Sequence, residues 1–180
     1  MNMIKALFGN AIFVASCIFL FSILSLFSAL IAEYVYGMQP CILCMYQRYA
    51  FASTALLSFG ALAVLFSPSG LKISSALVAI CGLAFLAGGA LAFHHVGVEQ
   101  RWWVSIFEEC AAPFDIAGST DLMNLIEAAP AVRCEDIPWQ DPILGISMAG
   151  YNAIISPIAG IISLVASVCI WKRAIPAQQS

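Results

Sequence analysis

The segment AIFVASCIFLFSILSLFSALIA, residues 11–32, contains no charged side chain at any of its 22 positions. A helix of about 20 apolar residues is long enough to cross the hydrocarbon core of a bilayer. Three more uncharged runs of comparable length follow, at residues 49–66, 73–93 and 143–171. Of all 180 residues, 62% are hydrophobic and only 9% are charged, which is too apolar for a water-soluble domain. The sequence therefore predicts an integral membrane protein with four helical spans.

The connections between these runs predict an all-α, antiparallel four-helix bundle. The turn between the second and third runs contains Pro68 and Gly70, and it is short enough to make these two helices antiparallel neighbours. We interpret residues 1–180 as a single membrane domain. The predicted spans cover about residues 11–33, 43–66, 73–95 and 143–171, and a long polar loop covers residues 96–142.

The charged residues distinguish the two sides of the predicted bundle. Four basic residues fall at helix ends that share one side in a four-span topology: Lys5, Lys72, Lys172 and Arg173. The positive-inside rule assigns that side, with both termini, to the cytoplasm. Nine of the ten acidic residues lie in the loop on the opposite side, which also holds Arg101 and Arg133. This acidic loop explains the low sequence pI, and the charge pattern gives no indication of nucleic-acid binding.

A short apolar pattern predicts an additional helix within the loop. Thr120 is suited to cap its N-terminus. The apolar face of this helix would consist of Leu122, Met123, Leu125 and Ile126. Such a face is typical of an amphipathic helix lying on the membrane surface. A helix packed inside the loop itself explains the same pattern equally well.

The predicted topology divides the seven cysteines into two groups. The outer group consists of Cys41, Cys44, Cys110 and Cys134. The inner group lies in the cytoplasmic halves of the spans and consists of Cys17, Cys81 and Cys169. We interpret the inner group as packing residues, because a free cysteine often behaves as a small buried hydrophobic residue.

The outer cysteines favour redox chemistry over a purely structural role. A disulfide between Cys110 and Cys134 would close a loop of about 25 residues and could stabilise the fold. A disulfide between Cys41 and Cys44 would close almost no loop, whereas Cys-x-x-Cys at a helix start is typical of reversible dithiol chemistry. A zinc site usually needs a second closely spaced pair, and Cys110 and Cys134 are too far apart in sequence for that.

Three more residues are candidates for the same site. Arg48 lies one turn beyond Cys44 on the same predicted helix face, where it could stabilise a thiolate or bind a ligand oxygen. The alternative is that Arg48 only anchors the helix at the membrane boundary. His94 and His95 end the third span on the same outer side, and either could be a donor to a ligand or an interfacial residue without a chemical role.

Two motifs resemble a known family. The stretch PCILCMYQR, residues 40–48, resembles the signature of the disulfide bond formation protein B (DsbB) family of bacterial inner-membrane thiol oxidases. The stretches PW at residues 138–139 and LGISMAGYN at residues 144–152 resemble that family's entry into its last helix. The resemblance covers nearly the whole chain, including the order of the spans and of the two cysteine pairs.

The resemblance implies a function and a role for each site residue. Similar proteins take electrons from a periplasmic thioredoxin-like oxidase of the DsbA type and pass them to a membrane quinone, either ubiquinone or menaquinone. The partner would attack Cys110, and the released Cys134 would pass the electrons to Cys41. The remaining roles concern the quinone: Cys44 would face it, with Arg48 beside it and His95 nearby. No metal is implied, and the redox cysteines would lie on the periplasmic side of the inner membrane.

Two other classes of protein could also contain four membrane helices and these cysteines. Quinone reductases of the vitamin K epoxide reductase family are also four-helix redox bundles, but their loop cysteines precede the Cys-x-x-Cys pair. The order is reversed here. A non-enzymatic scaffold with structural disulfides would leave Arg48 and the spacing of Cys41 and Cys44 unexplained.

Overall fold

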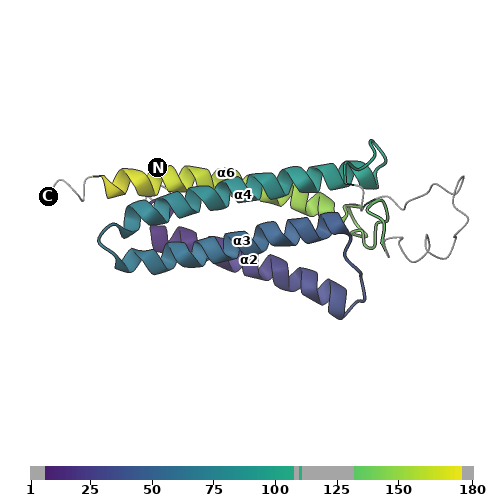
Figure 1. Ribbon diagram of the computed structural model, residues 1–180, viewed down its shortest axis with the longest axis horizontal. Coiled ribbons are helices and arrows are strands. Elements are labelled where there is room, and N and C mark those ends of the chain that lie inside the picture. Colours follow the sequence, from purple (N-terminus) through teal and green to yellow (C-terminus); the bar gives the residue numbers. More distant parts are fainter. Residues whose placement is uncertain (1–6, 108–109, 111–131, 176–180) are drawn as a thin grey trace, which may run out of the picture.

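Four long helices make up the protein in the computed structural model, which describes residues 7–107, 110 and 132–175 (Figure 1). The helices are α2 (Ala11–Tyr34), α3 (Ile42–Ala63), α4 (Gly70–Glu99) and α6 (Met148–Ala174), and the short 3-10 helix η1 (Val64–Phe66) extends α3. Within the described ranges there is no β-strand, only an isolated antiparallel bridge between Gln140 and Ser147. The predicted all-α four-helix fold is confirmed. The additional helix predicted near residues 120–126 lies outside the described residues.

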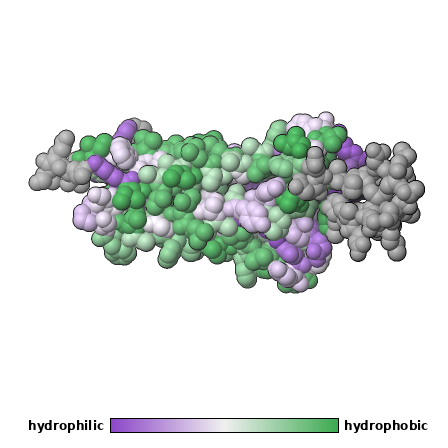
Figure 2. Space-filling view, viewed as in Figure 1, coloured by the Kyte–Doolittle hydropathy of each residue, from purple (hydrophilic) through white to green (hydrophobic). Residues whose placement is uncertain are grey.

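All four helices are long and apolar enough to cross a membrane. Even α3, the shortest of the four with 22 residues, extends about 33 Å at 1.5 Å per residue. Large apolar side chains such as Phe27, Leu56 and Ile161 are exposed on the surfaces of α2, α3 and α6. Figure 2 shows apolar residues covering most of the middle of the visible face, with strongly hydrophilic residues toward its two ends. The protein is therefore a multi-pass membrane protein.

Side-chain caps explain where the helices begin. The Cys41 sulfur accepts a hydrogen bond from the backbone N–H of Cys44 (3.3 Å), and this contact caps α3. Ser147 caps α6 in the same way by accepting from the N–H of Gly150 (3.0 Å). The last uncharged run begins at residue 143, but its first residues are not helical because Gly145 takes a positive φ of 65° and Ser147 is the cap.

The start of α6 is also held by a carboxylate in the preceding turn. Asp141 accepts hydrogen bonds from the backbone N–H of Leu144 (3.0 Å) and from the hydroxyl of Tyr151 (3.1 Å). The bond from Leu144 lowers the pKa of the Asp141 carboxyl, because it stabilises the charged form. The loop exit is thereby fixed to the first turns of α6, next to the outer end of α4.

Small residues allow α4 and α6, the most extensively packed pair of helices, to approach closely. A side chain at Gly82 would contact the carbonyl oxygen of Gly160 at 3.0 Å, and a side chain at Gly89 would contact the ring of Pro157 at 2.7 Å. Helices in a membrane associate through such close packing, because lipid provides no hydrophobic driving force between them. Pro157 lies inside α6 and faces Gly89, so its ring occupies space that a larger residue on α4 would fill.

The ends of the helices place both ends of the described chain at one end of the bundle. In Figure 1, α2 begins and α6 ends at the same end, where the turn from η1 to α4 also lies. Lys72 at the start of α4 lies 5.9 Å from the ring centroid of Trp171 near the end of α6. The connection between α2 and α3 and the segment between α4 and α6 lie at the opposite end. All four outer cysteines are found at that opposite end.

Candidate redox site

The Cys-x-x-Cys pair lies at the N-terminus of α3, with its two sulfurs facing each other. Cys41 Sγ and Cys44 Sγ are 2.9 Å apart, and both residues are free thiols. Cys41 is buried, whereas Cys44 is half-buried. Two thiolates on one tetrahedral zinc ion would be roughly 3.8 Å apart, given Zn–S bonds of about 2.3 Å. The shorter distance favours a pair that forms and breaks a disulfide, even though His95 adds a third potential ligand.

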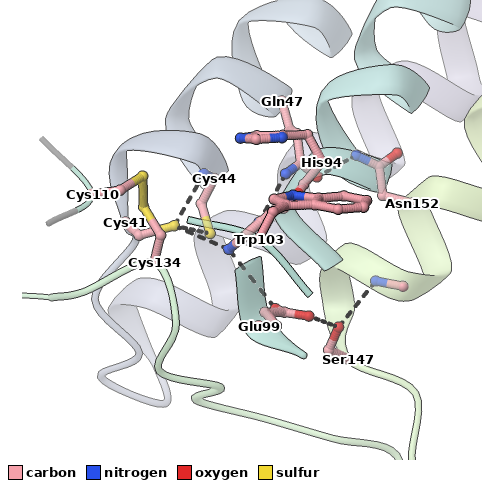
Figure 3. Close-up of polar contacts among 12 residues, drawn as sticks. Cys41, Cys44, Gln47, His94, Glu99, Trp103, Cys110, Cys134, Ser147 and Asn152 are labelled. Atoms are coloured by element: carbon pink, nitrogen blue, oxygen red, sulfur yellow. Dashed lines mark hydrogen bonds and ion pairs between the residues drawn. A yellow bond between two sulfur atoms is a disulfide. The ribbon is translucent and has the colours of Figure 1, made fainter. Parts of the chain in front are cut away.

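A second cysteine pair packs directly against the first. Cys110 and Cys134 form a disulfide, and both are buried, with 6% and 0% of their surface exposed. They belong to one buried cluster with Cys41, Leu43 and Val98. Figure 3 shows the disulfide beside the sulfurs of Cys41 and Cys44. Residues about 70 to 90 positions apart in sequence therefore bring two redox-capable pairs together.

His95 and Glu99 extend the site on α4. His95 Nε2 lies 3.5 Å from Cys41 Sγ and 3.8 Å from a carboxylate oxygen of Glu99. Both side chains are buried, and the other oxygen of Glu99 accepts a hydrogen bond from the hydroxyl of Ser147 (2.5 Å). Sequence reasoning missed Glu99. The sequence did contain a signal for it. Glu99 follows His95 by four residues, and residues at i and i+4 share one face of a helix.

The neighbouring histidine has different surroundings. The His94 ring stacks on Trp103, with the ring centroids 6.0 Å apart and the planes 10° apart. The Trp103 indole N–H donates to the backbone carbonyl of His94 (3.1 Å). The indole packs so closely over Gly97 that any side chain at that position would overlap it. The structure therefore places His95, and not His94, against the sulfur of Cys41.

Arg48 is held by two groups of α2. Its guanidinium forms an ion pair with Glu33 and donates to the backbone carbonyl of Ala29 (3.2 Å). Less than a fifth of either charged side chain is exposed, so the pair is partly withdrawn from solvent. Sequence reasoning placed Arg48 on the face that carries the sulfurs but did not identify Glu33, the only acidic residue outside the loop, as its partner.

A cavity of about 330 Å³ lies between α2, α3 and α6, next to these residues. It is found at the end of the bundle where α2 diverges from the other helices in Figure 1. Cys44, Arg48 and His95 all line it, so a ligand in the cavity would lie next to all three residues. Most of the rest of the lining is apolar and includes Phe21, Leu26, Phe51 and Ile155.

The three inner cysteines lie apart from this site. Cys81 is buried in α4 and its thiol donates to the backbone carbonyl of Thr54 (3.7 Å). Cys17 is exposed on α2, and Cys169 is half-buried on α6. All three are free thiols, and Cys81 belongs to the apolar core of the bundle with Val78 and Phe85. Cys81 is therefore a packing residue, as the sequence predicts, but the interpretation is wrong for Cys17, which is exposed on the surface of α2.

Comparison with known proteins shows the family. The family model described as disulfide bond formation protein DsbB matches residues 12–166. "Disulfide bond formation protein B 1" of Pseudomonas fluorescens is 29% identical over 135 residues, which cover 70% of this chain and 71% of that protein. "Disulfide bond formation protein B" of Aromatoleum aromaticum is 27% identical over 141 residues (74% and 78%), and that of Xanthomonas campestris is 31% identical over 123 residues (66% and 67%).

Among solved structures, no match to the chain was found. The family match nevertheless covers most of the chain, including α3 with Cys41 and Cys44 and the loop with Cys110 and Cys134. The chain therefore belongs to the DsbB family and is a membrane disulfide oxidoreductase that acts in disulfide bond formation.

Proposed function

We propose that the protein oxidises the dithiol of a periplasmic thioredoxin-like partner of the DsbA type and passes the electrons to a membrane quinone, either ubiquinone or menaquinone. The observation that carries this proposal is the position of Cys44. Its sulfur contacts that of Cys41, and the residue also lines the 330 Å³ cavity. Electrons that arrive from the loop pair through Cys41 can therefore leave through Cys44 to a ligand in the bundle.

Electron flow follows the order in which the two pairs are packed. A thiolate of the partner attacks Cys110 and forms a mixed disulfide, which releases Cys134 as a thiolate. Cys134 attacks Cys41 in the Cys41–Cys44 disulfide and releases Cys44. The second thiol of the partner then releases Cys110, which attacks Cys134, so that the loop disulfide forms again and Cys41 leaves as a thiolate. The partner has lost two electrons, and Cys41 and Cys44 now hold them as a dithiol.

The cavity fits a quinone head group. Ligand sites in proteins are typically clefts of about 300–1,000 Å³ with mostly apolar walls and a few polar groups. Here Arg48, Gln47 and Asn152 are among the polar residues of the wall, and Cys44 also lines the cavity. A bound quinone supplies an acceptor for the two electrons and two protons of the Cys41–Cys44 dithiol. Such an acceptor is needed because a DsbA-type oxidase has a potential of about −120 mV, above that of ordinary thiol buffers.

We also propose how the protein is oriented in the membrane. Lys72, Lys172 and Arg173 lie at the bundle end opposite the redox cysteines. By the positive-inside rule we place that end, and both termini, in the cytoplasm of a bacterial cell and the loop in the periplasm. Accessibility of Cys110 and Cys134 to a membrane-impermeant thiol reagent after reduction would test this orientation in intact inner-membrane preparations.

The direct test of the function uses the purified full-length protein, a soluble quinone and a reduced DsbA-type partner. We expect catalytic loss of quinone absorbance with one partner disulfide formed for each quinone reduced. A scaffold with structural disulfides would reduce no quinone. Absence of turnover with every combination of ubiquinone or menaquinone and a reduced DsbA-type partner would overturn the proposal.

Replacing Arg48 should weaken the use of quinone without affecting either disulfide. Arg48→Ala is expected to lower quinone reduction roughly 10- to 100-fold, because hydrogen bonds to charged groups contribute about 1.5–3 kcal/mol. Arg48→Lys should restore the rate only in part, since lysine keeps the charge but lacks the planar set of donors. The measurement is the rate as a function of quinone concentration.

The ion pair provides the control for this prediction. Glu33→Gln removes the charge that Arg48 contacts but leaves the guanidinium in the cavity wall. It should therefore retain quinone reduction better than Arg48→Ala. An equal loss in both variants would mean that Arg48 acts only by holding α2 and α3 together, and unchanged kinetics in both Arg48 variants would reduce Arg48 to a membrane anchor.

The inner cysteines should be dispensable. We expect the simultaneous replacement of Cys17, Cys81 and Cys169 by alanine to retain turnover, because none of them contacts the redox site. The buried Cys81 should account for most of a stability loss of about 1–3 kcal/mol. Turnover and thermal unfolding in detergent are the measurements. Loss of turnover in a triple variant that remains folded and inserted would contradict this division of the cysteines.

A further inference from the structure

The two ring nitrogens of His95 have different partners. Nδ1 lies 3.1 Å from Nε2 of Gln47, and Nε2 faces Cys41 Sγ at 3.5 Å and a carboxylate oxygen of Glu99 at 3.8 Å. His95 is only 3% exposed, so these neighbours, together with the backbone of Cys134, replace water as its hydrogen-bond partners. In a neutral imidazole one nitrogen donates and the other accepts, and the partners decide which tautomer is present.

The partner of Nδ1 is itself oriented by a chain of polar side chains from α6. The Ser156 hydroxyl donates to Oδ1 of Asn152, which leaves the amide N–H₂ of Asn152 pointing the other way. That group donates to Oε1 of Gln47 (2.6 Å). The N–H₂ end of Gln47 therefore faces His95 and can only donate. Figure 3 shows the side chains of Asn152 and Gln47, with dashed lines for the hydrogen bonds.

The partners of Nε2 are acceptors. The carboxylate of Glu99 has one oxygen bound by the Ser147 hydroxyl, and its other oxygen lies toward His95. A sulfur that carries negative charge also accepts hydrogen bonds. Both sides of the imidazole therefore favour the same tautomer: a lone pair on Nδ1 toward Gln47 and a proton on Nε2 toward Cys41 and Glu99.

We propose that a chain of three positioning residues sets the tautomer of His95, with the ring proton on Nε2 and directed at the Cys41 sulfur. The chain consists of Ser156, Asn152 and Gln47, and it connects α6 and α3 to α4. Its catalytic consequence rests on the proposed function. When Cys41 leaves as a thiolate and the loop disulfide forms again, the Nε2–H of His95 stabilises the charge on its sulfur.

The tautomer can be measured directly, because the chain contains only two histidines. In the purified full-length protein labelled with ¹⁵N-histidine, the two ring nitrogens of each imidazole give separate signals that distinguish a protonated from an unprotonated nitrogen. A His94→Gln variant identifies the signals of His95. We expect Nε2 of His95 to be protonated and Nδ1 to be unprotonated. A protonated Nδ1 in the unmodified protein would overturn the proposal.

Two nearly isosteric variants should reverse this pattern. Gln47→Glu replaces the donor opposite Nδ1 with a carboxylate, so Nδ1 should become protonated. Asn152→Asp does not touch His95, but it removes the donor that orients Gln47, so the Gln47 amide should turn over and present its oxygen to Nδ1. Gln39→Glu is the matched control, because it adds a carboxylate to the same cavity wall and should leave both nitrogens unchanged. An unchanged Nδ1 in both of the first two variants would overturn the proposal.

A second measurement connects the tautomer to the sulfur. In a Cys44→Ser background, Cys41 can be alkylated without its partner thiol, and the rate as a function of pH reports the thiolate of Cys41. We expect Asn152→Asp to reduce thiolate-dependent alkylation about tenfold at neutral pH, because the Nε2–H no longer stabilises the thiolate. This readout needs neither quinone nor a protein partner, so its failure is distinct from failure of the proposed function. An unchanged pH profile would show that the chain of positioning residues serves only the packing of the helices.

Discussion

Replacing Cys44 with serine is expected to abolish quinone reduction, with a loss of roughly 10³-fold or more. Serine keeps the size and the polar atom of the side chain, but it cannot form a disulfide or donate an electron pair as a thiolate does. The Cys110–Cys134 disulfide should still form, because neither of its sulfurs depends on Cys44. Quinone absorbance and the number of free thiols, measured on the same preparation, check both parts of the prediction.

Cys81→Ser is the matched control for this experiment. Cys81 is also a free thiol in the bundle, but it packs in the core away from the redox site and donates to Thr54. The same substitution there should leave quinone reduction within about threefold of the unmodified rate, apart from an effect on stability. Turnover that persists in Cys44→Ser would mean that the electrons reach the quinone without this sulfur, which would contradict the role proposed for it.

Replacing Cys134 with alanine is expected to trap the protein partner. Without Cys134, the mixed disulfide between Cys110 and the partner loses the internal thiol that would displace it. A DsbA-type partner that lacks its own resolving cysteine, and whose remaining thiol is activated as a mixed disulfide with thionitrobenzoate, should therefore accumulate in a covalent complex with most of the protein. The Cys110 thiolate attacks the partner's sulfur and displaces the thionitrobenzoate. Non-reducing gel electrophoresis measures the complex, and peptide mapping identifies the cysteine that is bonded to the partner.

The reciprocal variant provides the control for this trap. With Cys110→Ala and the same activated partner, only the buried Cys134 is left in the loop to attack, and we expect little or no complex. This order agrees with the exposure of the two residues, which is 6% for Cys110 and 0% for Cys134. A partner bonded to Cys41 or Cys44 would reverse the order and make the loop disulfide a structural link.

The charged residues next to Cys134 affect which loop sulfur leaves more easily. Arg133 precedes Cys134 and by sequence favours its thiolate, whereas Glu135 and Asp136, which follow it, oppose it. The guanidinium instead contacts Glu135 at 2.9 Å and Asp136 at 3.1 Å, and half of its surface is exposed. Because two carboxylates already neutralise this cation, it contributes little to the choice of leaving sulfur. The greater exposure of Cys110 therefore remains the structural argument for the order of exchange.

The sequence by itself determined the features that depend on neighbours along the chain. Four uncharged runs were sufficient for four membrane helices, because every backbone group in a bilayer must be paired within its own segment. Cys41 and Cys44 were identifiable because their spacing places both sulfurs at one helix start. The motif around them was sufficient to recognise the resemblance to the family. Helix ends were less predictable: residue 143 begins an uncharged run, but α6 begins only after the Ser147 cap.

Only the tertiary structure decided the contacts between helices. Gln47, His95 and Asn152 lie on α3, α4 and α6, and nothing along the chain indicates that one hydrogen-bond chain connects them. The pairing of Arg48 with Glu33 likewise depends on how α2 packs against α3. The physical reason is that apolar composition determines that a helix lies in the membrane, but not its rotation about its own axis. That rotation is set by close packing at residues such as Gly82 and by the need to pair each buried polar group with another.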